Sequence, residues 1–294
     1  MNDEEILAER FEAHRTHLRA VAYRMLGSLS EADDAVQDAW LRASRAGTDG
    51  VENLGGWLTT IVARVSLDVL RSRTSRREDP LDVHVPDPVI SGADGLDPEH
   101  EVLLADSVGL ALLVVLDTLP PAERLAFVLH DMFAVPFDDI APIVDRSPAA
   151  TRQLASRARR RVQGAAPAPD ADRSRQREVV DAFMAAARGG DFDALVAVLD
   201  PDVLMRADTG TADGRVSRLI RGARQVAQQA VTFAAYAAFA RPALVNGTPG
   251  IVTVPDGKLF SVMAFTVADG KVTEINLLAD PDRLAGLRWE PRSD

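Results

Sequence analysis

The apolar positions of the first 75 residues recur with the three-to-four-residue period of amphipathic helices. Residues 6–27 show this pattern and stop at Gly27, a residue that commonly ends helices. Ser30 has the chemistry of an N-cap, and it precedes a second periodic stretch over residues 30–46. A third helix is expected over residues 54–74. The pattern therefore predicts an all-α N-terminal domain.

Charge is concentrated on the outward sides of the second and third predicted helices. The second helix has an acidic side, and the third has a largely basic one that follows a loop with four glycines (residues 46–56). A glycine loop and a basic helix with a Trp suit a platform for single-stranded nucleic acid, since bases stack on aromatic rings and Arg neutralises phosphate. The alternatives are solvated charged faces and a Trp in the core. The outward residues are Asp33, Asp34, Gln37 and Asp38 on the second helix and Arg64, Asp68, Arg71 and Arg73 on the third, with Trp57 near its start.

Residues 136–162 read as two short helices joined by a tight turn. The first is expected over Phe137 to Val144, and the second begins with Ser147 as N-cap and Pro148 at its first position. An apolar stripe every fourth residue leaves a polar front of the kind that enters the major groove of DNA. An ordinary helical hairpin with a solvated basic face is the alternative. The stripe is Leu154, Ala158 and Val162, and the basic or polar positions are Arg146, Arg152, Gln153, Ser156, Arg157 and Arg160.

The pattern changes after a Pro-rich stretch at residues 78–98 and an Ala/Pro-rich stretch at 164–174. A helix over 174–188 and a strand over 202–208 precede a further helix and four strand-like segments separated by NGTPG, PDGK and ADGK turn signals. Helices followed by a meander of strands predict an α+β domain with helices packed on a curved sheet.

Composition narrows the function classes. The 294 residues suffice for two or three domains, and the absence of Cys excludes disulfides, zinc–thiolate sites and thiol redox chemistry. We find no apolar run of about 18 residues and no signal peptide, so we expect a cytoplasmic protein without membrane contact. The net charge of −11 is unevenly spread, with six Arg and no acid in residues 146–162. That distribution suits local DNA contacts together with a separate large basic partner, or a protein that shields its own basic surfaces.

Four segments in this order resemble an extracytoplasmic-function (ECF) sigma factor of the sigma-70 family. They are SEADDAVQDAWLRA, GGWLTTIVARVSLDVLRSR, LPPAERLAFVLHDMF and RSPAATRQLASRARRRV. The remainder resembles the SnoaL-like, nuclear-transport-factor-like domain that one branch of those factors carries. The resemblance implies two all-α sigma domains, the second with a helix-turn-helix, followed by an α+β SnoaL-like cone. The expected boundaries are region 2 at 1–77, an acidic linker at 78–97, region 4 at 98–163, a second linker at 164–173 and the SnoaL-like domain at 174–294.

The resemblance implies a role for each group of residues. Asp33, Asp34, Gln37, Asp38, Trp40 and Leu41 would bind the β′ clamp helices of core RNA polymerase, whose β flap would be a second contact. Trp57, Arg64, Asp68, Arg71 and Arg73 would line the path of the promoter −10 element and hold a flipped base. At the −35 element, Arg152, Gln153 and Ser156 would lie nearest the bases and Arg146, Arg157 and Arg160 on phosphates. The acidic linker would thread toward the polymerase active-site cleft and the RNA exit path.

Three shorter matches point to the branch with the SnoaL-like tail. HVPDP resembles the WLPEP-type linker motif, with His84 where Trp is usual, followed by Pro86, Asp87 and Pro88. ADPDRL resembles the tail motif NPDKL and supplies Asp280, Pro281, Asp282, Arg283 and Leu284, and TADGRV resembles a glycine-rich motif with Asp213 and Gly214. In that branch the tail contacts the sigma core and tunes its activity without a separate anti-sigma protein.

Enzyme activity is the main alternative for the tail, because SnoaL-like folds include cyclases and isomerases that use His and Asp. None of the five His follows residue 174, and Asp208 and Arg206 stand without a visible acid–base partner. We therefore expect no catalysis, cofactor or metal, whereas a small apolar ligand in the cone or a simple packed core both remain open. The residues concerned are Leu199, Val203, Met205, Phe233, Tyr236, Met263 and Phe265. Two other function classes are a ligand-sensing helix-turn-helix repressor, which leaves the acidic helix and glycine loop unexplained, and a SnoaL-like enzyme with an accessory DNA-binding domain.

Overall fold

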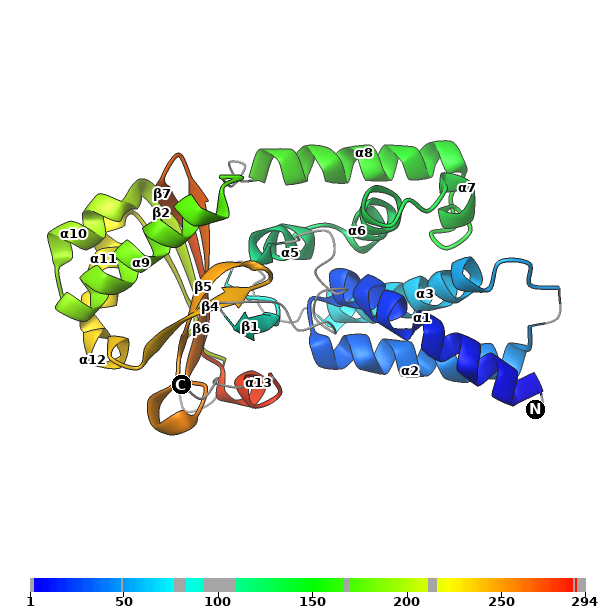
Figure 1. Ribbon diagram of the computed structural model, residues 1–294. Helices are drawn as coiled ribbons and strands as arrows, with labels where there is room; N and C mark the ends of the chain where they lie inside the picture. Colours follow the sequence, from blue (N-terminus) through cyan, green and yellow to red (C-terminus); the bar gives the residue numbers. More distant parts are fainter. Residues whose placement is uncertain are drawn as a thin grey trace. The chain divides into compact units, whose positions relative to one another are not determined.

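The computed structural model describes most of the chain, which forms two compact units (Figure 1). The first unit holds residues 3–76 and 115–165, and the second holds residues 83–92, 109–114 and the described residues from 170 onward. The described residues are 3–48, 50–76, 83–92, 109–165, 170–210, 216–287 and 289.

The first unit begins with the three predicted helices, α1 (Asp3–Leu26), α2 (Leu29–Ala46) and α3 (Leu54–Arg76). All three pack on one another around a core that includes Phe11, Leu18 and Leu58. Gly27 ends α1 as expected, with φ 71°. The predicted N-cap of α2 was wrong. The chain restarts one residue after Gly27, so Ser28 takes the N-cap position with extended backbone angles and Ser30 lies inside the helix.

Further helices follow in the chain. They are α5 (Leu110–Asp117), α6 (Pro121–Phe127), the π-helical turn η1 (Val128–Met132), α7 (Phe137–Ile140) and α8 (Pro148–Ala165). The predicted helix over 137–144 was too long, because Pro142 has no N–H to continue the helical ladder. Residues 141–145 form a turn in which Asp145 has φ 54° and the Arg146 N–H donates to the Ala141 carbonyl at 3.1 Å.

Buried arginine contacts join α1 to α6 within the first unit. The Arg124 guanidinium pairs with Asp117 and donates to the Arg24 carbonyl at 3.1 and 3.2 Å. The Arg24 guanidinium in turn lies 4.8 Å from the centre of the Phe133 ring. Because a buried charge is tolerated only when it is paired and hydrogen-bonded, these contacts specify how the helices of this unit pack.

The second unit is built on a seven-stranded sheet with the order β1-β4-β5-β6-β7-β2-β3. All neighbouring strands are antiparallel except β2 and β7, which are parallel. The Asn246–Gly247 and Asp269–Gly270 turns have positive φ at both residues, as the turn signals predict. The strands are β1 (Ile90–Gly92), β2 (Leu199–Asp208), β3 (Arg218–Arg221), β4 (Ala240–Val245), β5 (Thr248–Thr253), β6 (Ser261–Ala268) and β7 (Lys271–Leu278).

Helices cover one face of this sheet and confirm the predicted α+β architecture (Figure 1). Asp172 and Asp191 cap α9 and α10 with their carboxylates. A single turn of 3₁₀ helix, η3 (Pro255–Gly257), joins β5 to β6, and the short helix α13 (Pro281–Ala285) follows β7. The helices on the sheet are α9 (Arg173–Gly189), α10 (Phe192–Val198), α11 (Ala223–Thr232) and α12 (Ala234–Ala237).

Residues 83–92 differ from the sequence-based expectation of a separate linker. Residues 85–91 are buried, and the segment ends in β1, which pairs with β4. Val85, Val89 and Ile90 supply the apolar surface that is buried here. Pro86 and Pro88 favour an extended backbone, and because they have no N–H group they need no strand partner to accept a hydrogen bond from them. Strands β1 and β3 were not expected from the sequence. This part of the linker is therefore an integral part of the second unit.

Candidate functional site

The acidic side of α2 is exposed as predicted. Asp33, Asp34 and Gln37 face solvent, and Asp38 is half-buried. Asp33 pairs with Arg19 at 2.5 Å, and Asp38 pairs with Arg42 at 2.8 Å on the next turn. Exposed ion pairs of this kind are worth at most about 1 kcal/mol, so a basic partner surface can displace them.

Two apolar residues adjoin this acidic side. Trp40 is half-buried and packs edge-to-face on Phe11, with the ring centres 5.1 Å apart. Leu41 is 43% exposed, and it is the only large apolar side chain that the described part of the first unit leaves exposed. Leu41 and the half-buried Trp40 therefore add apolar surface beside the acidic side of α2.

The basic side of α3 contains both exposed residues and a residue that is held by contacts within the protein. Arg64, Asp68 and Arg71 are exposed and lie on one stripe at helical spacing. Arg73 is partly buried, where it pairs with Glu31 and donates to the Leu26 carbonyl at 3.1 Å. Arg73 therefore attaches α3 to the end of α1 and to the first turn of α2.

The start of α3 places the predicted Trp57 within reach of the glycine loop. Trp57 is half-buried, so it is neither fully in the core nor free on the surface. The Asn53 side chain accepts a hydrogen bond from the Gly56 N–H at 3.0 Å, and the Thr59 hydroxyl donates to the Gly55 carbonyl at 2.8 Å. These local hydrogen bonds hold the entry to α3 in one conformation.

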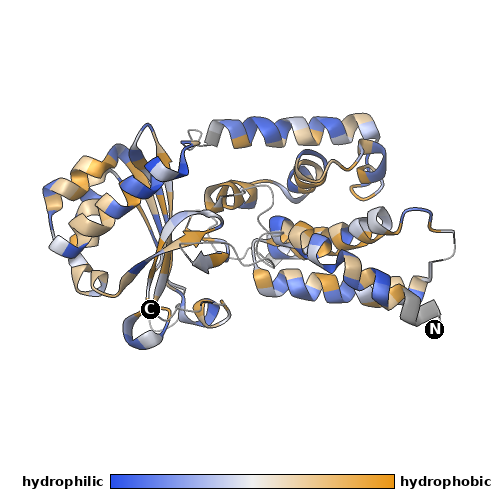
Figure 2. Ribbon diagram, viewed as in Figure 1, coloured by the Kyte–Doolittle hydropathy of each residue, from blue (hydrophilic) through white to orange (hydrophobic). Residues whose placement is uncertain are grey.

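The second helix of the predicted helix-turn-helix is α8, which is largely hydrophilic along its length (Figure 2). Ser147 is its N-cap, with its hydroxyl 3.3 Å from the Ala150 N–H, as predicted. Ala155 and Ala158 are buried against α6 and α7, and Leu154 and Val162 are half-buried. The outward positions Arg152, Gln153, Arg157 and Arg160 are exposed, and Ser156 is half-buried.

The arginines of this helix-turn-helix are not equivalent. Glu123 of α6 is buried and accepts from Arg157 at 2.7 Å and from Arg161 at 3.0 Å. Arg152 instead lies over the Phe137 ring at 5.3 Å, and no described carboxylate pairs with it. Arg146 and Arg160 contact only nearby carbonyls among the described residues, those of Asp145 and Ser156. Arg157 therefore anchors α8 to α6, whereas Arg146, Arg152 and Arg160 remain available to a ligand.

The ADPDRL motif folds into the capped helix α13. The Asp280 carboxylate accepts from the Asp282 N–H at 3.0 Å and lies 3.5 Å from the Arg283 N–H, and Pro281 occupies the first helical position. Leu284 is buried. This cap turns the chain directly after β7 and brings the Arg283 guanidinium to Asp208 at the end of β2.

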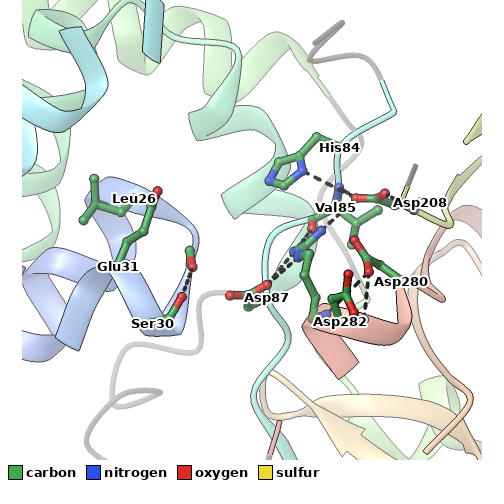
Figure 3. Close-up of polar contacts among 12 residues, drawn as sticks. Leu26, Ser30, Glu31, His84, Val85, Asp87, Asp208, Asp280 and Asp282 are labelled. Carbon is green, nitrogen blue, oxygen red and sulfur yellow. Dashed lines mark hydrogen bonds and ion pairs between the residues drawn. The ribbon is translucent and has the colours of Figure 1, made fainter. Parts of the chain in front are cut away.

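Arg283 joins the linker motif to the sheet. Its guanidinium contacts the Asp87 carboxylate at 2.5 and 2.8 Å, the Asp208 carboxylate at 2.8 Å and the Val85 carbonyl at 2.5 Å. Asp208 also accepts from the Val85 N–H at 3.0 Å and lies 3.4 Å from His84 Nδ1 (Figure 3). We call these five residues, His84, Val85, Asp87, Asp208 and Arg283, the linker clasp. Pro86 and Pro88, buried between them and β1, complete the linker motif.

The linker clasp holds Asp208 as a carboxylate. Burial by itself raises the pKa of Asp208, but hydrogen bonds from His84 and the Val85 N–H, together with the charge of Arg283, outweigh it and lower the pKa to about 2. The charge is therefore fully formed at neutral pH. A buried carboxylate that is multiply hydrogen-bonded strongly favours the arrangement that supplies its partners.

A second attachment lies farther along the linker. The Val89 N–H donates to the Asn246 side-chain oxygen at 3.0 Å, and the Asn246 N–H donates to the Val89 carbonyl at 2.8 Å. Residues 90–92 then continue as β1 along β4. Residues 85–92 of the linker are thus attached to the rest of the second unit at both ends.

Sequence reasoning found some of these residues and missed others. His84, Asp87 and Arg283 were singled out from motifs, and the structure brings them together. Asp208 was considered only as an isolated acid, and Asn246 only as a turn residue. Their partners are distant in sequence, so no local pattern could indicate the contacts. The predicted contacts of Asp213 and Gly214 lie outside the described residues.

Two further properties of the described residues bear on function. They contain no group of three or more His, Asp or Glu side chains that could hold a metal ion. None of the helices among them is long and apolar enough to span a membrane.

Comparisons with known proteins identify the family of this chain. Sigma-70 region 2 matches residues 10–76, and sigma-70 region 4 matches residues 109–162. The ECF RNA polymerase sigma factor SigJ of Mycobacterium tuberculosis is 41% identical over 291 residues, covering 94% of this chain and 92% of that protein. The probable ECF sigma factor SigI of the same organism is 34% identical over 293 residues, covering 99% of both. The crystal structure of M. tuberculosis SigJ superposes with a TM-score of 0.75 at 37% identity, over 95% of this chain and 99% of that one.

The helical regions 2 and 4, followed by the α+β tail, define a sigma-70-type transcription initiation factor with a SnoaL-like domain. At this identity over nearly its whole length, the chain belongs to the ECF RNA polymerase sigma factors. Members of this family direct promoter-specific transcription initiation and are not enzymes. The comparisons therefore favour the sigma-factor function over the repressor and cyclase alternatives.

Proposed function

We propose that the exposed faces of α2, α3 and α8 each make one of three contacts in promoter-directed initiation. The acidic side of α2, with Leu41, binds the basic β′ clamp helices of core RNA polymerase. The stripe of Arg64, Asp68 and Arg71, with Trp57, binds the opened −10 element. The exposed front of α8 reads the −35 element while the same region contacts the β flap. We assign these roles to region 2 at residues 1–77 and region 4 at 98–163.

The charge distribution supports this division. A chain with a net charge of −11 has weak general attraction for DNA, so its basic α8 binds a promoter firmly only when another contact adds affinity. Core polymerase supplies that contact through α2. Two weak contacts on one assembly act at high effective concentration, which raises their combined affinity.

We further propose that the SnoaL-like domain, residues 174–294, restrains initiation by holding the linker. One observation carries this proposal: residues 85–91 of the linker are buried on the tail. A polymerase cannot contact a buried segment, so the linker must leave the linker clasp before it can thread toward the active-site cleft. Tail and polymerase then compete for the same stretch of chain.

Run-off transcription tests the proposal. Purified core polymerase, the full chain and a template with the promoter region of the chain's own gene should give a promoter-dependent transcript only when the chain is present. Arg283→Gln, which removes the central cation of the linker clasp, should raise the yield several-fold. Arg221→Gln is the matched control, because Arg221 is exposed and has no ion pair with a described residue.

Two outcomes would contradict the proposal. The absence of any promoter-dependent transcript would refute the initiation role assigned to these surfaces. Equal yields from Arg283→Gln and Arg221→Gln, with hydrogen exchange showing a released linker in the former, would refute the restraint by the tail.

A further inference from the structure

The SnoaL-like domain encloses a cavity of about 470 Å³ between the sheet and helices α9, α11 and α12. This volume falls within the range of small-molecule sites in proteins. Of the residues that the sequence suggested as lining, Met205, Phe233, Tyr236 and Met263 do line it. Leu199, Val203 and Phe265 belong instead to the packed core. The cone is therefore partly filled and partly hollow.

The cavity opens through a rim of exposed apolar side chains. Val216 is 67% exposed, Phe233 49% and Tyr236 40%, and all three line the cavity. The Tyr236 ring is stacked on Phe260, another lining residue, at 4.5 Å. Leaving several large apolar side chains together in water is unfavourable, and such patches mark binding sites. An apolar ligand would cover them.

One end of the cavity carries polar groups without partners among the described residues. Arg218 lies opposite Ala207 in the β2–β3 pair, on the cavity side of the sheet, and makes no ion pair with a described carboxylate. The Thr209 hydroxyl oxygen is buried and has no hydrogen-bond partner in the described part of the chain. A buried unpaired hydroxyl costs about 1–3 kcal/mol, which a ligand oxygen could recover. The guanidinium of Arg218, which lines the same cavity, favours an anionic ligand group.

We infer that this cavity is a binding site for a small apolar acid, a molecule with a hydrocarbon or ring body and one carboxylate. The body fills the space between Met205, Met263 and Phe233, and the carboxylate lies at Arg218 and Thr209. Arg218 is the one charged residue among the described residues that line this mostly apolar cavity, and it sets this specificity, because an uncharged body of the same shape leaves Arg218 and Thr209 unpaired.

The site shares its backbone with the linker clasp. Strand residues alternate between the two faces of a sheet, so Ala207 and Thr209 line the cavity while Asp208, between them, points to the linker. Leu277 on β7 and Ala279 directly after it line the cavity, and the Ala279 N–H donates to the Asp208 carbonyl at 2.7 Å. A ligand that shifts the ends of β2 and β7 therefore acts on Asp208 directly. This coupling rests on the proposed role of the linker clasp, whereas ligand binding itself does not.

Isothermal titration calorimetry of the full chain with sodium dodecanoate tests the site, with 1-dodecanol as the uncharged probe of equal length. We expect saturable binding of dodecanoate and at least tenfold weaker binding of dodecanol. Arg218→Leu should weaken dodecanoate binding at least tenfold. Arg221→Leu, on the same strand but opposite Leu204 on the other face, should leave it unchanged. Ala230→Trp, which fills the cavity from α11, should abolish binding.

The site would be overturned if dodecanoate binding did not saturate, or if Arg218→Leu and Arg221→Leu bound dodecanoate with equal affinity. Should Ala230→Trp fail to fold, the Arg218 and Arg221 pair decides alone. Titrating Arg283→Gln then tests the coupling, because linkage requires the affinity to change when the linker clasp opens. We expect at least a threefold difference from the unaltered chain, and equal affinities would overturn the coupling. None of these titrations involves polymerase, so their failure is distinct from a failure of the proposed transcription mechanism.

Discussion

Arg283 and Asp87 stand 196 residues apart in sequence and contact each other at 2.5 and 2.8 Å, which joins the tail motif to the linker motif. Asp208 lies on the other side of the guanidinium at 2.8 Å. One cation thus pairs with a carboxylate of the linker and a carboxylate of the sheet. Removing this cation leaves two buried carboxylates close together, which is costly for both.

Arg283→Gln should therefore release the linker from the tail. Loss of one partner from a buried ion pair costs about 3 kcal/mol, or about a hundredfold in the opening equilibrium. We expect the Val85 and Val89 amides to exchange with deuterium about a hundredfold faster. Hydrogen exchange measured by mass spectrometry on peptides covering residues 83–92 checks this. Unchanged exchange of these peptides, or equal acceleration in Arg221→Gln, would show that Arg283 does not hold the linker.

The linker clasp should also make the stability of the second unit depend on acidity. The pKa of Asp208 is lowered from 3.8 to about 2, so the unfolded chain takes up a proton at higher pH than the folded one. The stabilisation is thus fully present above about pH 4 and is lost as pH falls through about 2. Its size is on the order of 2 kcal/mol.

Urea denaturation of the chain and of Asp208→Asn, each at pH 5 and at pH 2, measures this contribution. Other carboxylates titrate in both proteins and cancel in the comparison. The difference in free energy of unfolding between the two proteins should shrink by about 2 kcal/mol from pH 5 to pH 2. A difference that is constant with pH would mean that Asp208 titrates normally in the folded chain.

Two arginines on α8 should behave differently when replaced. Arg152→Ala should lower the affinity of the holoenzyme for its promoter about tenfold or more and leave stability unchanged, because Arg152 makes no ion pair with a described carboxylate. Arg157→Ala should instead lower the melting temperature, since Glu123 is buried and loses one of its two arginines. The expected loss is below about 1 kcal/mol, because Arg157 is itself half exposed.

Electrophoretic mobility shift with holoenzyme and differential scanning fluorimetry of the free chain separate these effects. Gln163→Ala, at an exposed position near the end of the same helix, is the control for both. If Arg152→Ala binds the promoter as tightly as Gln163→Ala does, α8 does not present Arg152 to DNA.

The polymerase-binding role of α2 predicts sensitivity to charge reversal. Asp34 is exposed and has no ion pair among the described residues, so Asp34→Arg should fold normally. Facing a basic partner, it should lower the affinity for core polymerase at least tenfold in fluorescence anisotropy. Glu9→Arg makes the same charge change at an exposed position of α1 and should bind as the unaltered chain does. Equal losses in both variants would indicate a general charge effect and no contact at α2.

Much of the fold could be predicted from the sequence, because helices and hairpins leave local patterns. The periodic stretches predicted α1, α2, α3 and α9, and the Asn246–Gly247 and Asp269–Gly270 turns predicted the β-meander. Local detail was less predictable. Proline at position 142 shortened α7, and the left-handed Gly27 moved the α2 cap to Ser28.

Non-local contacts were beyond sequence reasoning. Strand β1 has three residues in a Pro-rich acidic stretch, and it forms only because Ile90 finds Val245 as its partner. The linker motif and the tail motif were both recognised, but nothing in either indicated that Asp208 would join them. The division of the cone into core and cavity also depends on non-local packing, because Val203 is enclosed in the core while Met205 and Met263 line the cavity.

The most direct test of the restraint by the tail is to lock the linker in place. The chain has no Cys, so an engineered pair would be its only disulfide. Ile90 and Val245 are directly opposed in the antiparallel β1–β4 pair, a geometry in which Cα atoms are close enough for a disulfide. Run-off transcription with Ile90→Cys/Val245→Cys compares the oxidised and the reduced protein, with each single variant as the control for oxidant. The oxidised pair should give less than about a tenth of the transcript of the reduced pair. Equal transcription from the locked and the unlocked linker would contradict the account.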